Sequence, residues 1–404
     1  MFENGRKRVK PFYSPPSLLL RQAASALYFT YLTGWRRLPQ WLLNAKKVMP
    51  TAAGALGMGC IGFPVHPVWE VTNACNLRCR QCHAGSGKAL NDELSTAEGI
   101  KLLDDMAGVA EFRMLAFGGG EPLVRKDIFE LVAHARKLGF QVSIATNGTL
   151  LTTAMARELK KLGAVNLAIG LNANDREVHE SITGVPGSFE RSKQAVYATI
   201  EAGLNLQINT SAMKENRAAI PGLLDFASEV KARIVLLYQL VPEGRGEAEM
   251  ELSTREYLSL TEMVAGKQRT NSAIIEPTCS PQYWAYLMTR NGHGIHGKSR
   301  KPGRLAQALF KGCVAGSGLC YIKPDGEVWP CPFVPVSAGN VRRQALGDIW
   351  YRSELFNSLR DRRKLTGAKC RSCHFQYLCG GCRGRAYAHS GDYLQDDPLC
   401  FLSQ

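Results

Sequence analysis

The stretch ACNLRCRQCHAG, residues Ala74–Gly85, places three cysteines within eight residues: Cys75, Cys79 and Cys82. Three thiolates underfill both a structural zinc site and an ordinary iron–sulfur cluster, because each normally takes four protein ligands. Zinc would need a fourth ligand, and His83 is adjacent in sequence and poorly placed to supply it. A short loop with this spacing suits three corners of a four-iron cluster and leaves the fourth iron open to a small molecule. We therefore expect a catalytic metal centre here rather than a closed structural one.

The composition is that of an ordinary globular protein with unusual cysteine use. The chain has 404 residues, 45% hydrophobic and 21% charged, which allows a large core and a smaller second domain. Its 13 cysteines lie in tight groups, as metal-binding cysteines do, and are not spread like a disulfide scaffold. We see no pattern of a cleavable signal peptide before them. We therefore expect the protein in a reducing cytoplasm.

The first fifty residues carry much of the net charge of +15. They hold nine Lys or Arg residues and one acid, Glu3, so this segment contributes +8. The fourteen residues between Arg21 and Arg36 are uncharged but too short for a comfortable membrane span. Two interpretations stay open: a basic amphipathic helix peripheral to the inner membrane surface, and a helix packed against the main domain. The charge alone does not indicate nucleic-acid binding.

From Val68 onward, short β-rich runs alternate with helix-length segments whose apolar residues recur every three to four positions. Several helical segments end on a glycine suited to a helix C-cap, as at Gly139 and Gly163. These repeats predict an α/β fold whose parallel sheet curls into a partial (β/α)6 TIM-like barrel. Chemistry in such folds lies at the C-terminal ends of the strands, and the three-cysteine loop follows the first strand. The predicted strands cover residues 68–72, 113–119, 141–148, 166–172, 206–212 and 233–241.

The chain divides into four predicted parts. A basic and apolar extension covers residues 1–62, and the partial barrel covers residues 63–250. Residues 251–309 are less regular and predict a linker with one or two helices. Residues 310–404 hold eight cysteines and predict a C-terminal iron–sulfur domain.

The motif CNLRCRQC, with its Cys-x3-Cys-x2-Cys spacing, resembles that of the radical S-adenosylmethionine (SAM) enzymes. The resemblance implies that the amine and carboxylate of SAM bind the open iron of a [4Fe–4S] cluster. An electron from the reduced cluster then cleaves SAM to give a 5′-deoxyadenosyl radical. It also implies an electron donor such as a flavodoxin or ferredoxin.

Further stretches at strand ends are similar to the SAM site of this family. GGGEP follows the second predicted strand. The resemblance implies that its glycines let the backbone approach the SAM amine, and that Glu121 fixes the turn or accepts a hydrogen bond from that amine. ATNGTLL follows the third strand. Many relatives carry Ser-Leu-Asp on the fourth strand, where this chain reads Gly-Leu-Asn at residues 170–172, so the contact to the SAM ribose stays open. The implied SAM-binding residues are Gly118, Gly119, Gly120, Glu121, Pro122, Thr146, Asn147, Asn172, Asn209 and Arg245.

The C-terminal cysteines resemble the SPASM extension found on many radical SAM enzymes. Gly326, five residues before Cys331, and the segment at residues 339–350 match that extension as well. The resemblance implies two auxiliary [4Fe–4S] clusters, three clusters in all. A pair of zinc ribbons is the alternative, because Cys-x2-Cys pairs do not exclude zinc. Family precedent assigns Cys313, Cys320, Cys331 and Cys382 to one cluster and Cys370, Cys373, Cys379 and Cys400 to the other.

Two cysteines remain outside these sets. Cys60 lies in a Gly-rich apolar run and is expected to be a small buried hydrophobic residue. Cys279 follows a β-like segment after the barrel and is a candidate catalytic residue, as a hydrogen donor to a radical or as a substrate contact. An inert role for Cys279 stays open, because cysteine reactivity requires exposure.

The finer resemblance is to enzymes of the alternative haem pathway and of denitrification haem assembly, which remove acetate or propionate side chains from an iron porphyrinoid. It rests on LVPEGRG at residues 240–246, GNVR at 339–342 and the cysteine-rich segment at 379–400, and it covers residues from about 66 onward. It implies that Arg245 binds a carboxylate of the substrate or of SAM, since arginine suits planar carboxylates. His293 and His296 are either axial ligands of a substrate iron or exposed loop residues.

Two other functions stay open at this point. The same scaffold modifies ribosomal peptides or proteins, so a peptide maturase is the main alternative. A non-catalytic iron–sulfur electron carrier belongs to another class. It is disfavoured by the three-cysteine loop and by GGGEP, which a carrier would not need.

Overall fold

The computed structural model describes residues 27, 34, 66–109, 111–112, 114–164, 166–290 and 312–402. The expectations for Cys60, His293, His296 and nearly all of the N-terminal extension lie outside these residues. In the described part, no helix is both long and apolar enough to cross a membrane.

A single ten-stranded sheet forms the centre of the molecule, in the order β10-β9-β8-β1-β2-β3-β4-β5-β6-β7. Neighbours from β1 to β7 are parallel, and β8 also runs parallel to β1. The β8–β9 and β9–β10 pairs are antiparallel. The strands are β1 His66–Glu70, β2 Met114–Gly118, β3 Gln141–Thr146, β4 Asn166–Gly170, β5 Asn205–Ala212, β6 Ile234–Gln239, β7 Ile274–Thr278, β8 Leu319–Ile322, β9 Glu327–Trp329 and β10 Gly339–Asn340.

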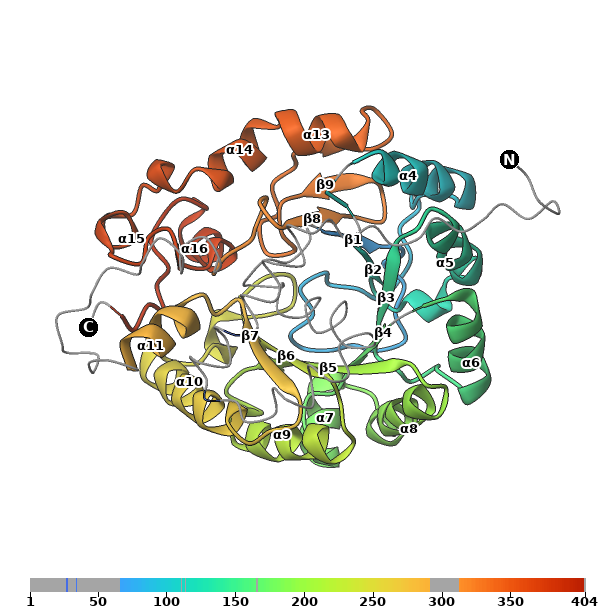
Figure 1. Cartoon of the computed structure of the whole chain (residues 1–404), viewed down its shortest axis with the longest axis horizontal. Helices are drawn as coiled ribbons and strands as arrows, with labels where there is room; N and C mark the ends of the chain where they lie inside the picture. Colours follow the sequence, from blue (N-terminus) through green and yellow to red (C-terminus); the bar gives the residue numbers. More distant parts are fainter. Residues whose placement is uncertain are drawn as a thin grey trace.

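Helices surround the curved sheet as an outer arc (Figure 1). This placement explains the apolar run of β4, NLAIG, because a parallel strand in such a fold is covered on both faces. β5 instead alternates half-buried and buried residues, with Asn209 and Ser211 on its half-buried face. The helices are α4 Thr96–Gly108, α5 Ile128–Lys137, α6 Thr153–Leu162, α7 Arg176–Thr183, α8 Ser188–Glu201, α9 Ile220–Glu229, α10 Thr254–Gln268, α11 Gln282–Arg290, α13 Leu346–Arg352, α14 Glu354–Arg360, α15 Ala368–Ser372 and α16 Arg383–Ser390.

Helix boundaries follow local capping signals. Ser95 and Glu98 form a capping box at the start of α4, and Ser253 and Glu256 form another at the start of α10. Gly163 ends α6 in the left-handed conformation that only glycine adopts without strain. These short-range signals explain why the helical segments of the barrel are visible in the sequence.

The α/β fold with a partial barrel is confirmed, and the six predicted strands overlap β1 to β6. The sheet is longer than predicted, because β7 lies in the segment expected to be a linker and pairs with β6 from Ile234↔Ile274 onward. At the other end, β8 to β10 of the C-terminal domain extend the same sheet beyond β1. The two parts therefore share a sheet as well as a core.

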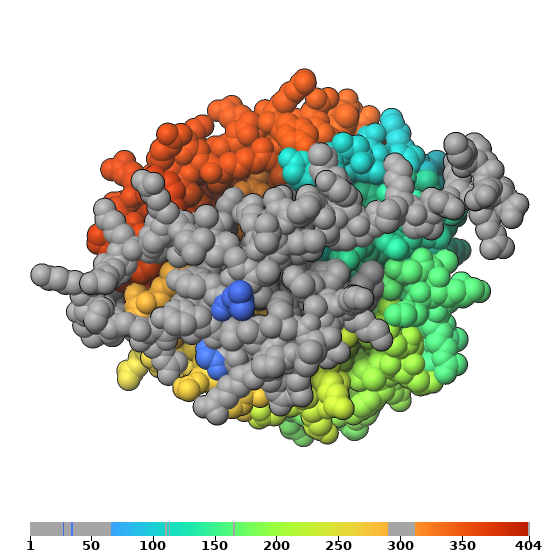
Figure 2. All heavy atoms as spheres, in the orientation of Figure 1, coloured from blue at the N-terminus to red at the C-terminus, as the bar shows by residue number. Residues whose placement is uncertain are grey.

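The C-terminal domain packs on the first helix of the barrel. Helix α13 contacts α4, and Arg342 Nε donates to Glu98 Oε1 at 2.7 Å. Figure 2 shows the orange and red surface of the C-terminal domain adjoining the cyan surface of the α4 region. One hydrophobic cluster runs from Trp69 of β1 to Phe401 near the end of the chain. This packing fixes the cysteine-rich domain beside the C-terminal ends of the barrel strands.

Candidate active site

The three-cysteine loop leaves the C-terminal end of β1 and is anchored through its backbone. Cys75 N donates to Gly87 O at 3.1 Å, and Arg78 N donates to Thr183 O at 3.0 Å at the end of α7. The loop is therefore fixed at its start and its middle before any ligand is considered.

The structure brings the three thiols of this loop together. Burial raises the pKa of Cys79 to about 12, and the neighbouring Cys82 and Cys75 thiols add to the rise. Asn147 Nδ2 lies 3.9 Å from Cys75 Sγ as a donor. Thiols that raise one another's pKa in this way are suited to bind metal as thiolates, because the metal's charge relieves their repulsion.

The GGGEP turn packs directly on the backbone that carries the cysteines. Gly120 N donates to Thr72 O at 2.7 Å, and Glu121 N donates to Ala74 O at 2.8 Å. A Cβ atom at Gly120 would lie 2.2 Å from Ala74 O, and one at Gly119, whose φ is +133°, would lie 2.5 Å from Thr72 O. Larger residues would push the turn away from the loop.

Glu121 is completely buried and joins this turn to the end of β3. Its Oε1 accepts from Thr146 Oγ1 at 2.7 Å and from Leu123 N at 3.0 Å, and its Oε2 accepts from Asn147 N at 2.7 Å. Burial raises the pKa of Glu121 to about 7, although these hydrogen bonds oppose the rise. The carboxyl group thereby fixes the position of Asn147 beside Cys75.

Arg245, expected to bind a carboxylate, lies instead on the cysteine loop. Its Nε donates to Cys79 O at 2.9 Å, and its Nη1 donates to Ser86 O at 2.8 Å. The preceding Gly244 has a φ of +64°, and a Cβ there would lie 2.2 Å from His83 O. The segment after β6 is therefore pressed against the loop, and the guanidinium binds backbone carbonyls where we expected a carboxylate.

A cavity of about 350 Å³ opens between this loop and the C-terminal domain. Cys79 and His83 line it on one side, and Cys313, Cys331 and Cys382 line it on the other. No Lys or Arg is among the described residues that line it. Its apolar lining residues include Val68, Leu77, Leu240, Val241, Val314 and Phe333.

The predicted SAM-binding residues fall into two groups. Some line the cavity, and the others lie outside its lining, in the turn behind it, at the end of β3 or against the loop. The lining group is Gly118, Gly119, Asn147, Asn172 and Asn209, and the other group is Gly120, Glu121, Pro122, Thr146 and Arg245.

Two of the lining asparagines present their amide NH2 groups as donors. Asn172 Oδ1 accepts from Gln81 Nε2 at 3.0 Å, and Asn209 Oδ1 accepts from Gln207 Nε2 at 2.7 Å. Asn172 N donates to Nδ1 of His179, and burial lowers the pKa of His179 to about 4, so that ring is a neutral acceptor. The Asn172 backbone is held in place, and the side-chain nitrogen is left for a ligand.

Glu70, Tyr321 and His83 form a hydrogen-bonded group at the cavity edge that was not predicted from the sequence. Tyr321 Oη donates to Glu70 Oε1 at 2.6 Å and lies 2.9 Å from His83 Nε2. Burial of Glu70 opposes ionisation, but the hydrogen bond to His83 and the charge of Lys323 lower its pKa to about 2. The position of Glu70 at the end of an apolar strand could have marked it as a site residue. Its partners Tyr321, on β8, and Lys323, after β8, are far away in sequence and are identified only by the fold.

The structure brings together at least three of the four cysteines of the predicted second auxiliary set. Burial raises the pKa of the Cys379 thiol, and the Cys400 and Cys370 thiols raise it further. Cys373 N donates to Cys370 O at 3.4 Å, which places Cys373 one turn along the same segment. The chemistry of this donor set fits an iron–sulfur cluster.

The first auxiliary set is brought together only in part. Burial raises the pKa of Cys331, and the Cys313 and Cys382 thiols add to the rise, so these three are neighbours. Cys320 is fully buried in the hydrophobic core. It lies on β8 between two cavity-lining residues, Leu319 and Tyr321, so strand alternation turns it to the other face. Its predicted partners lie at the cavity.

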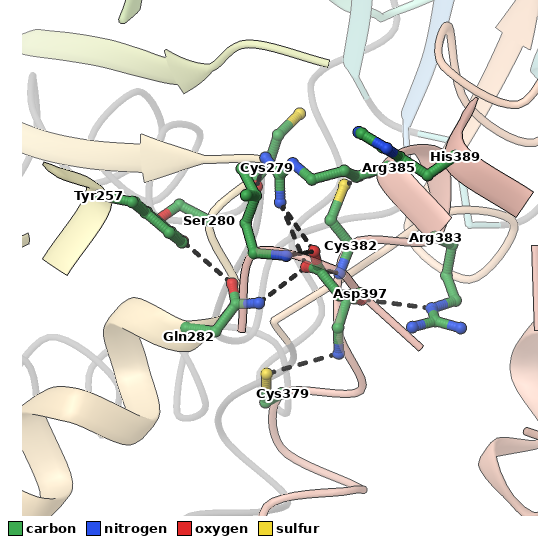
Figure 3. Close-up of polar contacts among 12 residues, drawn as sticks. Tyr257, Cys279, Ser280, Gln282, Cys379, Cys382, Arg383, Arg385, His389 and Asp397 are labelled. Carbon is green, nitrogen blue, oxygen red and sulfur yellow. Dashed lines mark hydrogen bonds and ion pairs between the residues drawn. The ribbon is translucent and has the colours of Figure 1, made fainter. Parts of the chain in front are cut away.

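A buried ionic network connects the barrel to the C-terminal cysteines (Figure 3). Arg385 Nη1 lies 3.2 Å from both carboxylate oxygens of Asp397, and its Nη2 donates to Cys279 O at 3.0 Å. Asp397 Oδ2 accepts from Cys382 N at 2.8 Å and from Gln282 Nε2 at 2.7 Å. Burial opposes ionisation of Asp397, but the Arg385 charge and these hydrogen bonds lower its pKa. The network ties the end of β7 to the start of α16.

The donor sets fit metal clusters by their chemistry. No disulfide joins the twelve cysteines that lie in described residues. Nor does any group of three or more His, Cys, Asp or Glu side chains there have the arrangement of a metal-ion site. Backbone N–H groups point at the sulfurs, a feature that tunes iron–sulfur ligands. These contacts are Leu77 N to Cys75, Phe375 N to Cys373, Gly381 N to Cys379 and Arg385 N to Cys382, at 3.4 to 3.5 Å.

Comparison with known proteins agrees with this geometry. Residues 69–227 match the family model of the radical SAM superfamily, and residues 313–374 match that of the SPASM iron–sulfur cluster-binding domain. An AdoMet-dependent heme synthase of Methanosarcina barkeri is 35% identical over 82% of this chain and 95% of its own length. One of Nitratidesulfovibrio vulgaris is 34% identical over 82% of this chain and 90% of its own length.

A solved structure shares the fold. SuiB of Streptococcus suis, bound to its precursor peptide SuiA, has a TM-score of 0.67 and 20% identity, and covers 90% of this chain and 81% of its own. At that identity the likeness concerns the fold alone. Together with the relatives of higher identity, the matches show that this chain is a radical SAM enzyme that uses SAM and iron–sulfur clusters, and that it belongs to the SPASM-containing members of the superfamily.

Proposed function

We propose that this enzyme modifies or removes carboxylated side chains of an iron porphyrinoid. The observation that carries the proposal is one cavity lined on one side by the three-cysteine loop and on the other by auxiliary cysteines. A substrate there contacts both the radical-generating and the auxiliary site. Two relatives of more than 30% identity, named as heme synthases, support the choice of substrate.

The roles of the chain's residues follow from where they lie. Cys75, Cys79 and Cys82 would hold the first [4Fe–4S] cluster, and the GGGEP turn with Asn147 would hold SAM beside it. When bound, this cofactor pair supplies a 5′-deoxyadenosyl radical that abstracts a hydrogen atom from a substrate side chain. Arg245 and Glu121 act by holding the loop and the turn in register.

The cavity suits a flat apolar ring with polar substituents. Its walls include aliphatic residues and Phe333, and the donors that it offers a carboxylate include the neutral NH2 groups of Asn172 and Asn209. A neutral donor binds a carboxylate more weakly than arginine does. Because such a site binds carboxylates weakly, a product that has lost one of them can leave it readily.

The test incubates the reduced enzyme and SAM with iron porphyrinoids that carry acetate or propionate groups. We expect formation of 5′-deoxyadenosine coupled to a product whose mass reports a changed or lost side chain. Uncoupled SAM cleavage with every porphyrinoid would reject the substrate assignment.

A peptide maturase is the second candidate, because the absence of Lys and Arg among the described lining residues is equally suited to a neutral peptide. Turnover of a precursor peptide without turnover of a porphyrinoid would favour it. A non-catalytic electron carrier has no support, since a carrier would not need the packed GGGEP turn.

The remaining parts of the proposal concern cluster number and cellular setting. Two auxiliary clusters beside the first give three [4Fe–4S] clusters, supplied with electrons by a flavodoxin or ferredoxin. The grouped cysteines support a cytoplasmic protein, and the net charge of +8 in the first fifty residues supports contact with the inner membrane surface. Deleting residues 1–50 tests this contact: release from anionic vesicles with SAM cleavage intact supports it, and equal vesicle binding rejects it.

A further inference from the structure

We propose that Cys279, and not Cys320, completes the first auxiliary cluster site together with Cys313, Cys331 and Cys382. The inference rests on the proposed function only in assuming that an auxiliary iron–sulfur cluster occupies this site. It adds a ligand from the barrel to a cluster otherwise held by the C-terminal domain.

The thiols of Cys279 and Cys382 line the same cavity and lie close enough to act on each other, and the Cys331 thiol also acts on Cys279. Cys331 is in turn a neighbour of Cys313 and Cys382. All four residues line the same cavity. The four cysteines therefore line one cavity as a chain of neighbours, which is the number of cysteine ligands that a [4Fe–4S] cluster takes.

The backbone at Cys279 is held in an unusual conformation. Its φ is +56°, in the left-handed region that costs a residue with a side chain free energy. Such strain persists where the surroundings impose it and is concentrated at functional sites. Here Arg385 Nη2 binds the Cys279 carbonyl, directly after β7.

The same network positions Cys382. Arg385 pairs with Asp397, and Asp397 Oδ2 accepts from Cys382 N at 2.8 Å. Arg385 and Asp397 are both fully buried, so the pair is not loosened by water. One ion pair thus fixes two cysteines that come from β7 and from the start of α16, which Figure 3 shows side by side.

Cys320 lacks these features. It pairs in register with Pro67 on β1 and is buried in the core, on the face of β8 opposite the cavity-lining Tyr321. Burial alone raises the pKa of its thiol, and the charged group that acts on it is Arg360. The family precedent that paired Cys320 with this set follows its place in the sequence, whereas Cys279 lies beside the set in space.

The experiment compares Cys279→Val with the matched variant Cys320→Val in the full-length protein after anaerobic reconstitution. The readouts are iron and sulfide per chain and the EPR spectrum of the reduced and oxidised protein. We expect Cys279→Val to lose about four irons or to show a three-iron signal, and Cys320→Val to keep the wild-type iron content. Cys279→Ser serves if the valine variant does not fold, because an oxygen ligand retains iron but changes the EPR spectrum.

The outcomes distinguish failure of the Cys279 assignment from failure of the auxiliary-cluster assignment. Loss of auxiliary iron in Cys320→Val with retention in Cys279→Val overturns the inference and leaves the proposed function intact. Wild-type iron content and spectra in both Cys279 variants also overturn it. Absence of auxiliary iron from the wild-type protein instead rejects the cluster assignment on which the inference rests.

Discussion

The guanidinium of Arg245 lies on the loop that carries the three cysteines, with its Nε donating to the carbonyl oxygen of Cys79 at 2.9 Å. A second donor, Nη1, binds Ser86 O at 2.8 Å. The arginine therefore connects the segment after β6 to both halves of the loop. This arrangement makes it a positioning residue for the first cluster rather than a ligand of the substrate.

Replacing Arg245 by methionine should loosen the loop while keeping the length of the side chain. Losing charge-assisted hydrogen bonds to carbonyls should cost roughly 1–3 kcal/mol of loop stability. We expect faster loss of iron from the first cluster under a chelator and slower SAM cleavage. Arg217→Met, which removes an exposed arginine paired with Glu256 at 3.5 Å, is the matched control. Unchanged iron retention together with weaker porphyrinoid binding would return Arg245 to the carboxylate role.

Gly120→Ala should disrupt the GGGEP turn, whereas Gly266→Ala, on α10, should be tolerated. A Cβ at Gly120 would lie 2.2 Å from a backbone oxygen, but one at Gly266 would meet nothing within 4 Å. We expect the Gly120 variant to lose SAM binding by at least tenfold in a calorimetric titration of the reconstituted protein. Equal SAM affinity of the two variants would show that the turn does not position the ligand.

Glu121 should make the wild-type protein less stable as the pH rises. Its pKa is raised from 4.5 to about 7 in the folded state, so between these values the folded chain keeps a proton that the unfolded chain has lost. The stability of the wild type relative to Glu121→Gln should therefore fall by roughly 2–3 kcal/mol from pH 4.5 to pH 8. Anaerobic urea unfolding at several pH values measures this difference. A difference that is constant with pH would contradict the shifted pKa.

The iron content should report three clusters. We expect about twelve irons and as many sulfides per chain after anaerobic reconstitution. Replacing Cys75, Cys79 and Cys82 together with alanine should lower the iron by about four and abolish SAM cleavage. Two tightly bound zinc ions without auxiliary iron would show that the C-terminal cysteines form zinc sites.

Local patterns explain what the sequence could predict. β1 to β6 are short β-rich runs, and the helices between them carry capping signals such as Gly163, so both are visible over short range. β7 was recognised as a β-like segment before Cys279 but was left outside the barrel; its Pro277, which lacks a backbone donor, is tolerated because β7 lies at the edge of the sheet. The parallel pairing of β8 with β1 joins residues far apart in the chain and has no local signal.

The same limit applies to the site. Spacing identified the cysteines, and family precedent grouped Cys320 with residues that lie at the cavity, but neither shows which face of a strand a side chain occupies. Arg245 was recognised as important from LVPEGRG, but its partners are carbonyl oxygens more than 150 residues away in sequence. Residue type predicted the chemistry of these positions, and only the fold shows their contacts.

Asn172→Asp should separate contacts to SAM from contacts to the substrate. Gln81 Nε2 donates to Asn172 Oδ1 at 3.0 Å, and an aspartate keeps this acceptor while replacing the free NH2 group by a second oxygen. A SAM ribose hydroxyl can donate to that oxygen, so SAM binding should be retained. A substrate carboxylate loses a donor and meets a negative charge.

If Asn172 faces the substrate, as its place in the cavity lining suggests, the KM for a carboxylated porphyrinoid should therefore rise at least tenfold. The KM for SAM, measured as 5′-deoxyadenosine formation without substrate, should change little and serves as the internal control. A lowered KM for SAM with an unchanged KM for the porphyrinoid would place Asn172 on the ribose instead, because the aspartate offers a ribose hydroxyl a charged acceptor. Added salt should partly restore porphyrinoid turnover in the aspartate variant, because ionic screening weakens the repulsion between the two carboxylates.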